Sequence, residues 1–153
     1  MTIRRAEVNE AGAIARVINA AFVPAEAFFV EGDRIGVDGV RELFGQGAFL
    51  VADEYAGAVY VEPRGERAYL GLLSVEPSRQ GSGLGRRLMA AAEDHARRHG
   101  CRFMDIRVVN LRTELPPMYE RLGYFQASTE PWPDVPSKLP CHFICMTKEI
   151  GRG

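Results

Sequence analysis

Hydrophobic and polar positions repeat along the chain with two different spacings. Short runs rich in β-branched and aromatic residues predict strands, because these side chains favour an extended, pleated backbone. The runs that predict strands are 3–8, 48–53, 56–62, 67–75, 103–109, 124–127 and 142–148. Apolar residues three or four positions apart predict helices from about 9, over 38–44, over 83–100 and over 116–121. Strands and helices that interleave in this way indicate an α/β (α+β) fold.

Capping residues, prolines and glycines set the expected ends of these elements. Asn9 and Asp38 are suitable N-caps for the first two helices. Pro24 should interrupt the first helix, and Gly100 should end the third. A turn signal at 63–66 predicts that the strands before and after it are antiparallel.

The strand 67–75, the helix 83–100 and the strand 103–109 form a strand–helix–strand unit. The two strands should therefore be parallel or splayed around a cleft. Ligands of such units lie at the carboxyl ends of the strands, where Val75 and Asn110 fall. We expect a cleft at this end of the unit.

Length and charge limit the classes of protein to consider. The 153 residues suit a single domain, 1–153. The 19 Lys and Arg residues nearly balance the 20 Asp and Glu residues, giving a net charge of −1, so we expect neither nucleic acid nor a membrane surface as partner. The apolar runs are far shorter than the ~20 residues that span a bilayer. A cytoplasmic protein is the resulting expectation.

Cysteine and histidine spacing argues against a disulfide framework or a metal site. Cys101, Cys141 and Cys145 are odd in number and form no Cys-x-x-Cys motif, so reduced thiols are expected. His95 and His99 have the i, i+4 spacing of a metal-binding pair, but no third ligand is suggested nearby in the sequence.

The most informative stretch, 72–92, reads LLSVEPSRQGSGLGRRLMAAA and predicts a strand, a glycine-rich turn and a helix. Gly81, Gly83 and Gly85 leave backbone amides unobstructed at the start of that helix. The helix dipole and its unpaired N–H groups favour a negative charge there, and nearby arginines add positive charge. These arginines are Arg79, Arg86 and Arg87. A di- or triphosphate is the expected guest.

Glycine spacing distinguishes among three phosphate-binding motifs. A P-loop is excluded because the sequence contains no Gly-Lys pair. A dinucleotide fingerprint fails because its third glycine would fall on Arg86 or Leu88. The pattern that remains, Gln80-x-x-Gly83-x-Gly85 after a strand, resembles the pyrophosphate loop of the GNAT superfamily of acyl-CoA N-acyltransferases.

A second motif strengthens this resemblance. Tyr119, Gly123 and Tyr124 form Tyr-x-x-x-Gly-Tyr downstream of the glycine loop, which is similar to the second GNAT signature. The resemblance spans about 3–148. It implies a GNAT-like mixed, mostly antiparallel central sheet flanked by helices, with a splayed strand pair forming the acyl-CoA cleft. It also implies an acetyl-CoA-dependent N-acetyltransferase.

The resemblance also implies roles for individual residues. The backbone of Leu73 and Val75 would pair with the pantetheine arm of acetyl-CoA. The pyrophosphate shell would comprise Gln80, Gly81, Ser82, Gly83, Leu84, Gly85 and Arg86, with Arg87 beside it. Asn110 would be a further coenzyme ligand, although it precedes Tyr119 by nine residues where a common family pattern has seven. Tyr119 would protonate the leaving thiolate.

The general base is not evident. Some family members carry a glutamate on the strand before the loop, where this sequence has Tyr69. A phenol is a poor base at neutral pH. Glu62, acting through a water chain, is the alternative that the sequence offers.

The resemblance implies an unidentified primary amine of a small molecule or a protein as the acceptor. We expect 25–36 and the proline-rich connection 128–140, which carries Trp132, to shape acceptor choice. Trp132 suits either a pocket wall or a homodimer contact, and surface packing is the alternative. Direct transfer without an acyl-enzyme is the expected mechanism. A non-catalytic acyl-CoA-binding sensor or regulatory module is the alternative function, and a structural partner domain is a further one.

Overall fold

The structure is a computed structural model, and it describes residues 1–151. The strands are β1 (Ile3–Arg5), β2 (Ala48–Ala52), β3 (Gly57–Arg64), β4 (Arg67–Val75), β5 (Phe103–Val109), β6 (Phe125–Pro131) and β7 (His142–Glu149). The helices are α1 (Ala11–Glu26), α2 (Val37–Phe44), α3 (Leu84–Arg98) and α4 (Leu115–Arg121). Short 3₁₀ turns cover Val8–Glu10, Asp53–Tyr55 and Pro77–Arg79.

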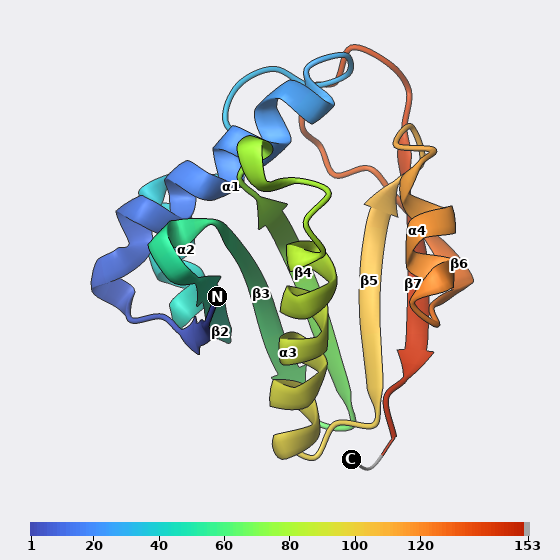
Figure 1. Ribbon diagram of the computed structural model, residues 1–153. Helices are drawn as coiled ribbons and strands as arrows, with labels where there is room; N and C mark the ends of the chain where they lie inside the picture. Colours follow the sequence, from blue (N-terminus) through green and yellow to red (C-terminus); the bar gives the residue numbers. More distant parts are fainter. Residues whose placement is uncertain (152–153) are drawn as a thin grey trace.

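The strands form one mixed sheet in the order β1-β2-β3-β4-β5-β7-β6. Within the described chain, β4 and β5 are the parallel neighbours and every other pair is antiparallel. β4 pairs with β5 only from Arg67–Phe103 to Tyr69–Asp105, and the two strands then separate (Figure 1). The prediction of a mostly antiparallel sheet with a splayed strand pair is confirmed.

A bulge interrupts β4 where it separates from β5. The register with β3 shifts between Ala58 and Tyr60, so that Leu72 and Leu73 together face Val59. Leu72 has a φ of 55°, in the left-handed region that side chains other than glycine rarely adopt. A one-residue insertion reverses which side chains point to which face of a sheet.

The packing follows this reversal. Leu70 contributes to the core beneath α3, whereas Leu72 packs with the cluster beneath α1 and α2. Leu73 and Val75 then pack on the α3 side. The bulge therefore places side chains at the C-terminal end of β4 on both sides of the opening between β4 and β5.

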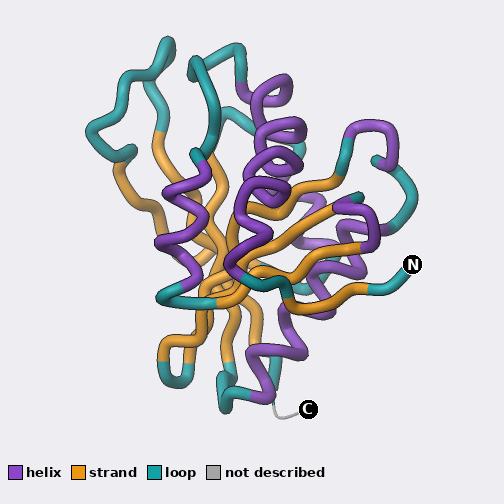
Figure 2. Tube along the Cα trace, turned by 90° about the vertical axis from the view of Figure 1, so that its left-hand side faces the viewer, coloured by secondary structure: helices purple, strands orange, loops and turns teal. Residues whose placement is uncertain are grey.

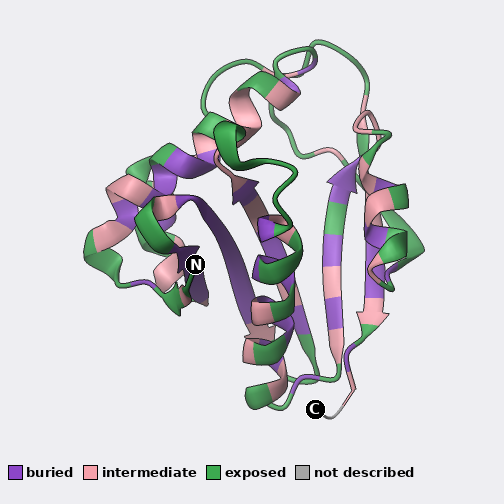
Figure 3. Cartoon of the chain, viewed as in Figure 1, coloured by how far each residue is buried: buried purple, intermediate pink, exposed green. Residues whose placement is uncertain are grey.

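Helices cover both faces of the sheet, and strands run through the middle of the molecule (Figure 2). Ile14 and Ile18 of α1 are fully buried against one face, and Leu88 of α3 is fully buried against the other. β3 lies between these layers and is buried from Gly57 to Glu62 (Figure 3). No helix of residues 1–151 combines the length and the apolar character needed to cross a membrane.

Two helix starts differ from the prediction. α1 begins at Ala11, after a turn in which Glu7 and Glu10 form a reciprocal capping box, so Asn9 is not the N-cap. Glu10 also accepts hydrogen bonds from Arg4, which ties the helix start to β1. α2 has Gly36 as its N-cap, and Asp38 lies in its first turn.

Two other boundaries were also predicted wrongly. Pro24 lies inside α1, which continues to Glu26, because a proline removes only one backbone donor and the buried stripe of α1 holds the helix together. β6 continues to Pro131 because β7 pairs with it as far as Pro131–His142. The connection between β6 and β7 is therefore 132–141 rather than 128–140.

A buried polar cluster joins α3 to the C-terminal strands. The Glu93 carboxylate, 6 % exposed, accepts a hydrogen bond of 2.8 Å from the Tyr124 hydroxyl. Lys148 Nζ lies 3.1 Å from the other carboxylate oxygen. Because a buried charge is stable only when it is paired and hydrogen-bonded, each partner of Glu93 contributes to holding α3 on the sheet.

We predict that Tyr124→Phe lowers the free energy of unfolding by about 1.5–3 kcal/mol, since a hydrogen bond to a buried charged group is lost. Urea denaturation monitored by circular dichroism measures the change. Tyr55→Phe is the matched control, because Tyr55 makes the same kind of bond to Glu10, 2.6 Å long, at a more exposed site and should cost less. Equal losses in the two variants would contradict the structural importance of the Glu93 cluster.

Candidate functional site

A cavity of about 780 Å³ lies where β4 and β5 separate. Its walls are 69–73 and Val75 of β4, 106–109 of β5, the C-terminal part of α1 and the segment 30–34. The opening between the two strands thus holds a large pocket, as the strand–helix–strand pattern predicts.

The glycine-rich turn forms the rim of this cavity. Gly81 and Gly83 both have a φ of +83°, and Gly83 is the N-cap of α3. Nε2 of Gln80 donates to the carbonyl of Val75 over 3.2 Å, which fixes the turn to the end of β4. Most of the turn is exposed to solvent (Figure 3).

Six consecutive backbone N–H groups of the turn, 81–86, make no hydrogen bond to any described residue. The first backbone bond of α3 comes from Arg87 N–H to Gly83 O over 3.2 Å. Unpaired amides at a helix start attract anions, because their partial positive charges add to that of the helix dipole. The turn is therefore suited to bind phosphate.

The arginines near the turn differ in how they are engaged. Arg79 lies 3.7 Å from Glu54, and Arg87 donates to the carbonyl of Met1 over 2.6 Å. Arg86 is exposed and has no ion pair within the described chain. Of the three, Arg86 has a guanidinium that is not already committed to a protein acceptor.

The structure brings together some of the residues that the sequence singled out. Five of them line the cavity: Leu73, Val75, Gln80, Gly85 and Tyr119. Asn110 lies outside the lining. Its backbone and side chain both bond to the backbone of His142, so it fixes the ends of β5 and β7 to each other.

Tyr119 is 7 % exposed and packs edge-on against Tyr124, with ring centres 6.1 Å apart. Its hydroxyl makes no hydrogen bond to a described residue. Burial raises the pKa of Tyr119 to about 12, with Arg112 opposing the shift and Tyr69 adding to it. The phenol is consequently protonated at neutral pH and can act as a donor in the cavity.

The base candidates named by the sequence lie in different places. The Glu62 carboxylate does not line the cavity; it accepts from the Tyr60 hydroxyl over 2.6 Å and pairs with Arg64. Tyr69 does line the cavity, and the guanidinium carbons of Arg64 and Arg107 lie 5.2 and 5.6 Å from its ring centre.

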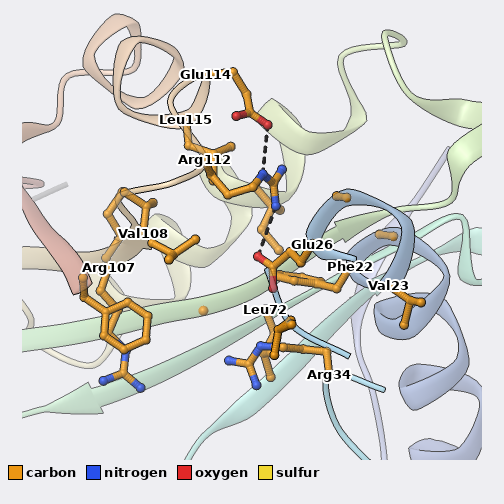
Figure 4. Close-up of a pocket in the computed structure, with 18 of the residues that line it drawn as sticks. Phe22, Val23, Glu26, Arg34, Leu72, Arg107, Val108, Arg112, Glu114 and Leu115 are labelled. Carbon is orange, nitrogen blue, oxygen red and sulfur yellow. Dashed lines mark hydrogen bonds and ion pairs between the residues drawn. The ribbon is translucent and has the colours of Figure 1, made fainter. Parts of the chain in front are cut away.

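A charged cluster that the sequence did not predict lines the cavity. Glu26, at the end of α1, lies 3.2 Å from Arg112, which also pairs with Glu114 at 2.9 Å (Figure 4). Burial raises the pKa of the Glu26 carboxyl, against the opposing effect of Arg112 and Arg34. The one sequence signal for it is an acid within the otherwise apolar run FVPAEAFFV.

The remaining wall is built by two segments that meet above the cavity. Lys138 donates from its backbone N–H to Phe29 O over 2.7 Å and from Nζ to Ala27 O over 2.8 Å. Trp132 lines the cavity and packs between Phe29 and Phe143, at 6.1 and 5.1 Å. Phe29 is buried core, whereas Phe28 is exposed.

The histidine pair lies on α3, away from the cavity lining. The rings of His95 and His99 stack at 4.4 Å, and His99 Nδ1 lies 2.8 Å from the carbonyl of His95. The part of the chain that the structure describes contains no group of three His, Cys, Asp or Glu side chains that could hold a metal ion.

Comparison with known proteins gives one sequence match and many structural matches. The sequence matches the family described as Acetyltransferase (GNAT) family over residues 9–124. A comparison with curated proteins finds no significant match. Among solved structures, smu.2055 from Streptococcus mutans UA159 has a TM-score of 0.81 at 15% identity, covering 98% of this chain and 99% of that one.

Two further structural matches were solved with a coenzyme. An aminoglycoside 6'-N-acetyltransferase complexed with coenzyme A has a TM-score of 0.78 at 20% identity, covering 98% of this chain and 97% of that one. The yncA protein from Salmonella typhimurium, with its cofactor acetyl-CoA, has a TM-score of 0.74 at 24% identity, covering 99% and 95%. At these identities the matches establish the shared fold.

Proposed function

Since the chain belongs to the acetyltransferase (GNAT) family, we propose that it transfers the acetyl group of acetyl-CoA directly to a primary amine of an acceptor. The observation that carries the proposal is the run of six unpaired amides, 81–86, at the rim of the cavity between β4 and β5. Two proteins of the same fold hold acetyl-CoA or coenzyme A, which supports the same co-substrate here.

In this proposal the glycine turn binds the pyrophosphate of acetyl-CoA. The amides of Gly81, Ser82, Gly83, Leu84, Gly85 and Arg86 donate to it, and the Arg86 guanidinium adds charge. Arg87 contributes at the edge of the site. The pantetheine arm extends along Leu73 and Val75, where β4 has lost β5 as its neighbour and can pair with an added strand. Asn110 is at most a peripheral ligand, because its side chain is bonded to His142.

The proposed chemistry is a direct transfer. The neutral amine attacks the thioester carbonyl carbon and forms the C–N bond, and a backbone N–H near Val75 stabilises the oxyanion. The C–S bond then breaks, and its electron pair goes to sulfur. Tyr119 donates its proton to the sulfur as the acylated nitrogen gives up a proton that restores the phenol. The concerted exchange matters because a phenol with a pKa of about 12 would not ionise alone.

The state of the cysteines supports this route over an acyl-enzyme. Burial raises the pKa of the Cys101 thiol and that of the Cys145 thiol, which disfavours the reactive thiolate. None of the three cysteines lines the cavity. A cysteine that acts as the nucleophile of a ping-pong mechanism would need a lowered pKa and a place in the cavity lining.

We predict that Gly85→Val weakens acetyl-CoA binding by about tenfold or more, measured by calorimetry. Gly85 suits this test because a Cβ there would meet only Val75 Cγ2 at 3.6 Å, so the fold tolerates the substitution while the side chain fills the coenzyme path. Gly83→Val would add backbone strain, since Gly83 has a φ of +83°. Ala90→Val, on the exposed face of α3, is the control. Equal acetyl-CoA affinity in both variants would show that the coenzyme does not bind at this turn.

We predict that the protein releases free thiol from acetyl-CoA with at least one amine from a panel of kanamycin, spermidine, L-amino acids and alanyl peptides. With that amine, Tyr119→Phe should lower kcat by about a hundred- to ten-thousand-fold, because it removes the donated proton but keeps the ring. Acetyl-CoA affinity should change little. Coenzyme binding without turnover on any amine would favour the non-catalytic sensor, and native turnover in the Phe variant would exclude Tyr119 as the acid.

We propose that the wall formed by 25–36 and the β6–β7 connection selects the acceptor. Trp132→Ala should then change kcat/KM for the best amine of the panel by about tenfold, equivalent to ~1.4 kcal/mol, with acetyl-CoA affinity unchanged. Phe28→Ala is the control, because Phe28 lies on the same wall but is exposed and outside the cavity lining. If both variants have native acceptor kinetics, this wall has no part in recognition.

A further inference from the structure

Glu26 has properties that set it apart from the other acids of the cavity lining. Its side chain is 11 % exposed, whereas the side chains of Glu31 and Glu114 are 83 % and 64 % exposed. Glu31 pairs with Lys138 at 3.6 Å, and Asp33 is exposed. Among the described lining residues, Glu26 is therefore the buried carboxylate.

One oxygen of Glu26 is held and the other is free. Oε2 accepts from Arg112 Nη1 over 3.2 Å, and Oε1 has no hydrogen bond to a described residue. Oε1 retains contact with solvent, since no buried side-chain oxygen of the described chain lacks a partner. Figure 4 shows this oxygen turned toward Leu72, away from Arg112. The free oxygen thus opens to the cavity in which Tyr119 also lies.

The charge of the cavity lining favours a cation. Arg112 is shared by Glu26 and Glu114, and Arg34 adds a second positive charge near Glu26. The described lining as a whole carries four carboxylates and three guanidiniums. An acceptor amine is protonated at neutral pH, and such an ammonium group complements this excess of negative charge.

We propose that Glu26 is the general base of the acetyl transfer and that Arg112 is its positioning residue; this inference rests on the proposed function. The acceptor ammonium donates one proton to Oε1 of Glu26, which frees the nitrogen lone pair that forms the C–N bond. The proton later leaves Glu26 for solvent. The second proton that the nitrogen loses restores Tyr119, so each turnover releases one proton.

The electrostatics around Glu26 are consistent with this role. Burial raises its pKa, which brings the carboxylate closer to the range in which a base accepts protons effectively near neutral pH. Arg112, from the β5–α4 connection, and Arg34, from the segment after α1, act in the opposite direction. Glu114, also on the β5–α4 connection, raises the pKa further. Arg112 also opposes the rise in the pKa of Tyr119, and both residues line the cavity.

The test is the pH dependence of kcat/KM between about pH 5 and 9, with acetyl-CoA and the best amine of the panel. The pH profile of the wild type should have an acidic limb, in which kcat/KM falls as Glu26 becomes protonated. Glu26→Gln should lower kcat/KM by about a hundred- to ten-thousand-fold and lose that limb. Arg112→Gln removes a cation that lowers the Glu26 pKa, so its limb should move to higher pH. Glu114→Gln removes an anion that raises the Glu26 pKa, so the acidic limb of this variant should move to lower pH.

Several outcomes would overturn the assignment. An acidic limb that persists in Glu26→Gln at native rate, or that moves in the same direction in Arg112→Gln and Glu114→Gln, excludes Glu26 as the base. Acetyl-CoA calorimetry would reveal whether Glu26→Gln folds. If it does not fold, opposite shifts of the acidic limb in Arg112→Gln and Glu114→Gln would still support Glu26 as the base. A wild type that acetylates no amine of the panel contradicts the proposed function itself, whereas an active wild type with an unaffected Gln variant contradicts Glu26 alone.

Discussion

The bulge in β4, at which Leu72 and Leu73 face a single residue of β3, is the constraint on which the site depends. Without it, β4 would continue with the same alternation and Leu72 would point into the core beneath α3. With it, Leu72 turns to the α1 side while Leu73 and Val75 face α3. The strand end thereby has side chains on both walls of the cavity and a backbone edge that β5 no longer covers. The left-handed φ of Leu72 is the local conformational cost of this arrangement.

Because β4 and β5 share so short a parallel ladder, other contacts must hold the two halves of the sheet. Near the C-terminal end of α3, Glu93 joins α3 to Tyr124 and Lys148. In the cavity lining, Glu26 and Arg112 join α1 to the β5–α4 connection. The first contact lies outside the cavity lining and stabilises the fold, whereas both residues of the second line the cavity. In the proposed mechanism, buried ion pairs of the same type have a structural role at the first position and a catalytic one at the second.

Much of the fold could be predicted because local patterns and tertiary packing agree. The strands 67–75 and 103–109, and the glycines that bound α3, have the predicted positions, since turn chemistry and hydrophobic spacing both mark them. The error at Pro24 arose because packing of α1 overrides a local signal. The extent of β6 depended on β7, and its residues are exposed throughout, so no burial pattern could mark its end.

The site could be predicted only as far as its residues are close in sequence. The glycine turn and Tyr119 belong to short motifs. The bond between Glu26 and Arg112 joins residues 86 positions apart, and neither residue lies in a motif. Asn110 lies at a strand end, where the sequence pattern predicts a ligand, but its side chain bonds to β7, a contact that only the folded sheet reveals.

The central claim is that acetyl-CoA occupies the opening between β4 and β5, with its pyrophosphate on the amides of 81–86. Amide hydrogen exchange measured by mass spectrometry, with and without saturating coenzyme A, tests it most directly. The account predicts slower exchange in peptides that contain 73–75 and 81–86, and unchanged exchange in the exposed strand 125–131. Saturable coenzyme A binding that leaves 73–75 and 81–86 unprotected would contradict it.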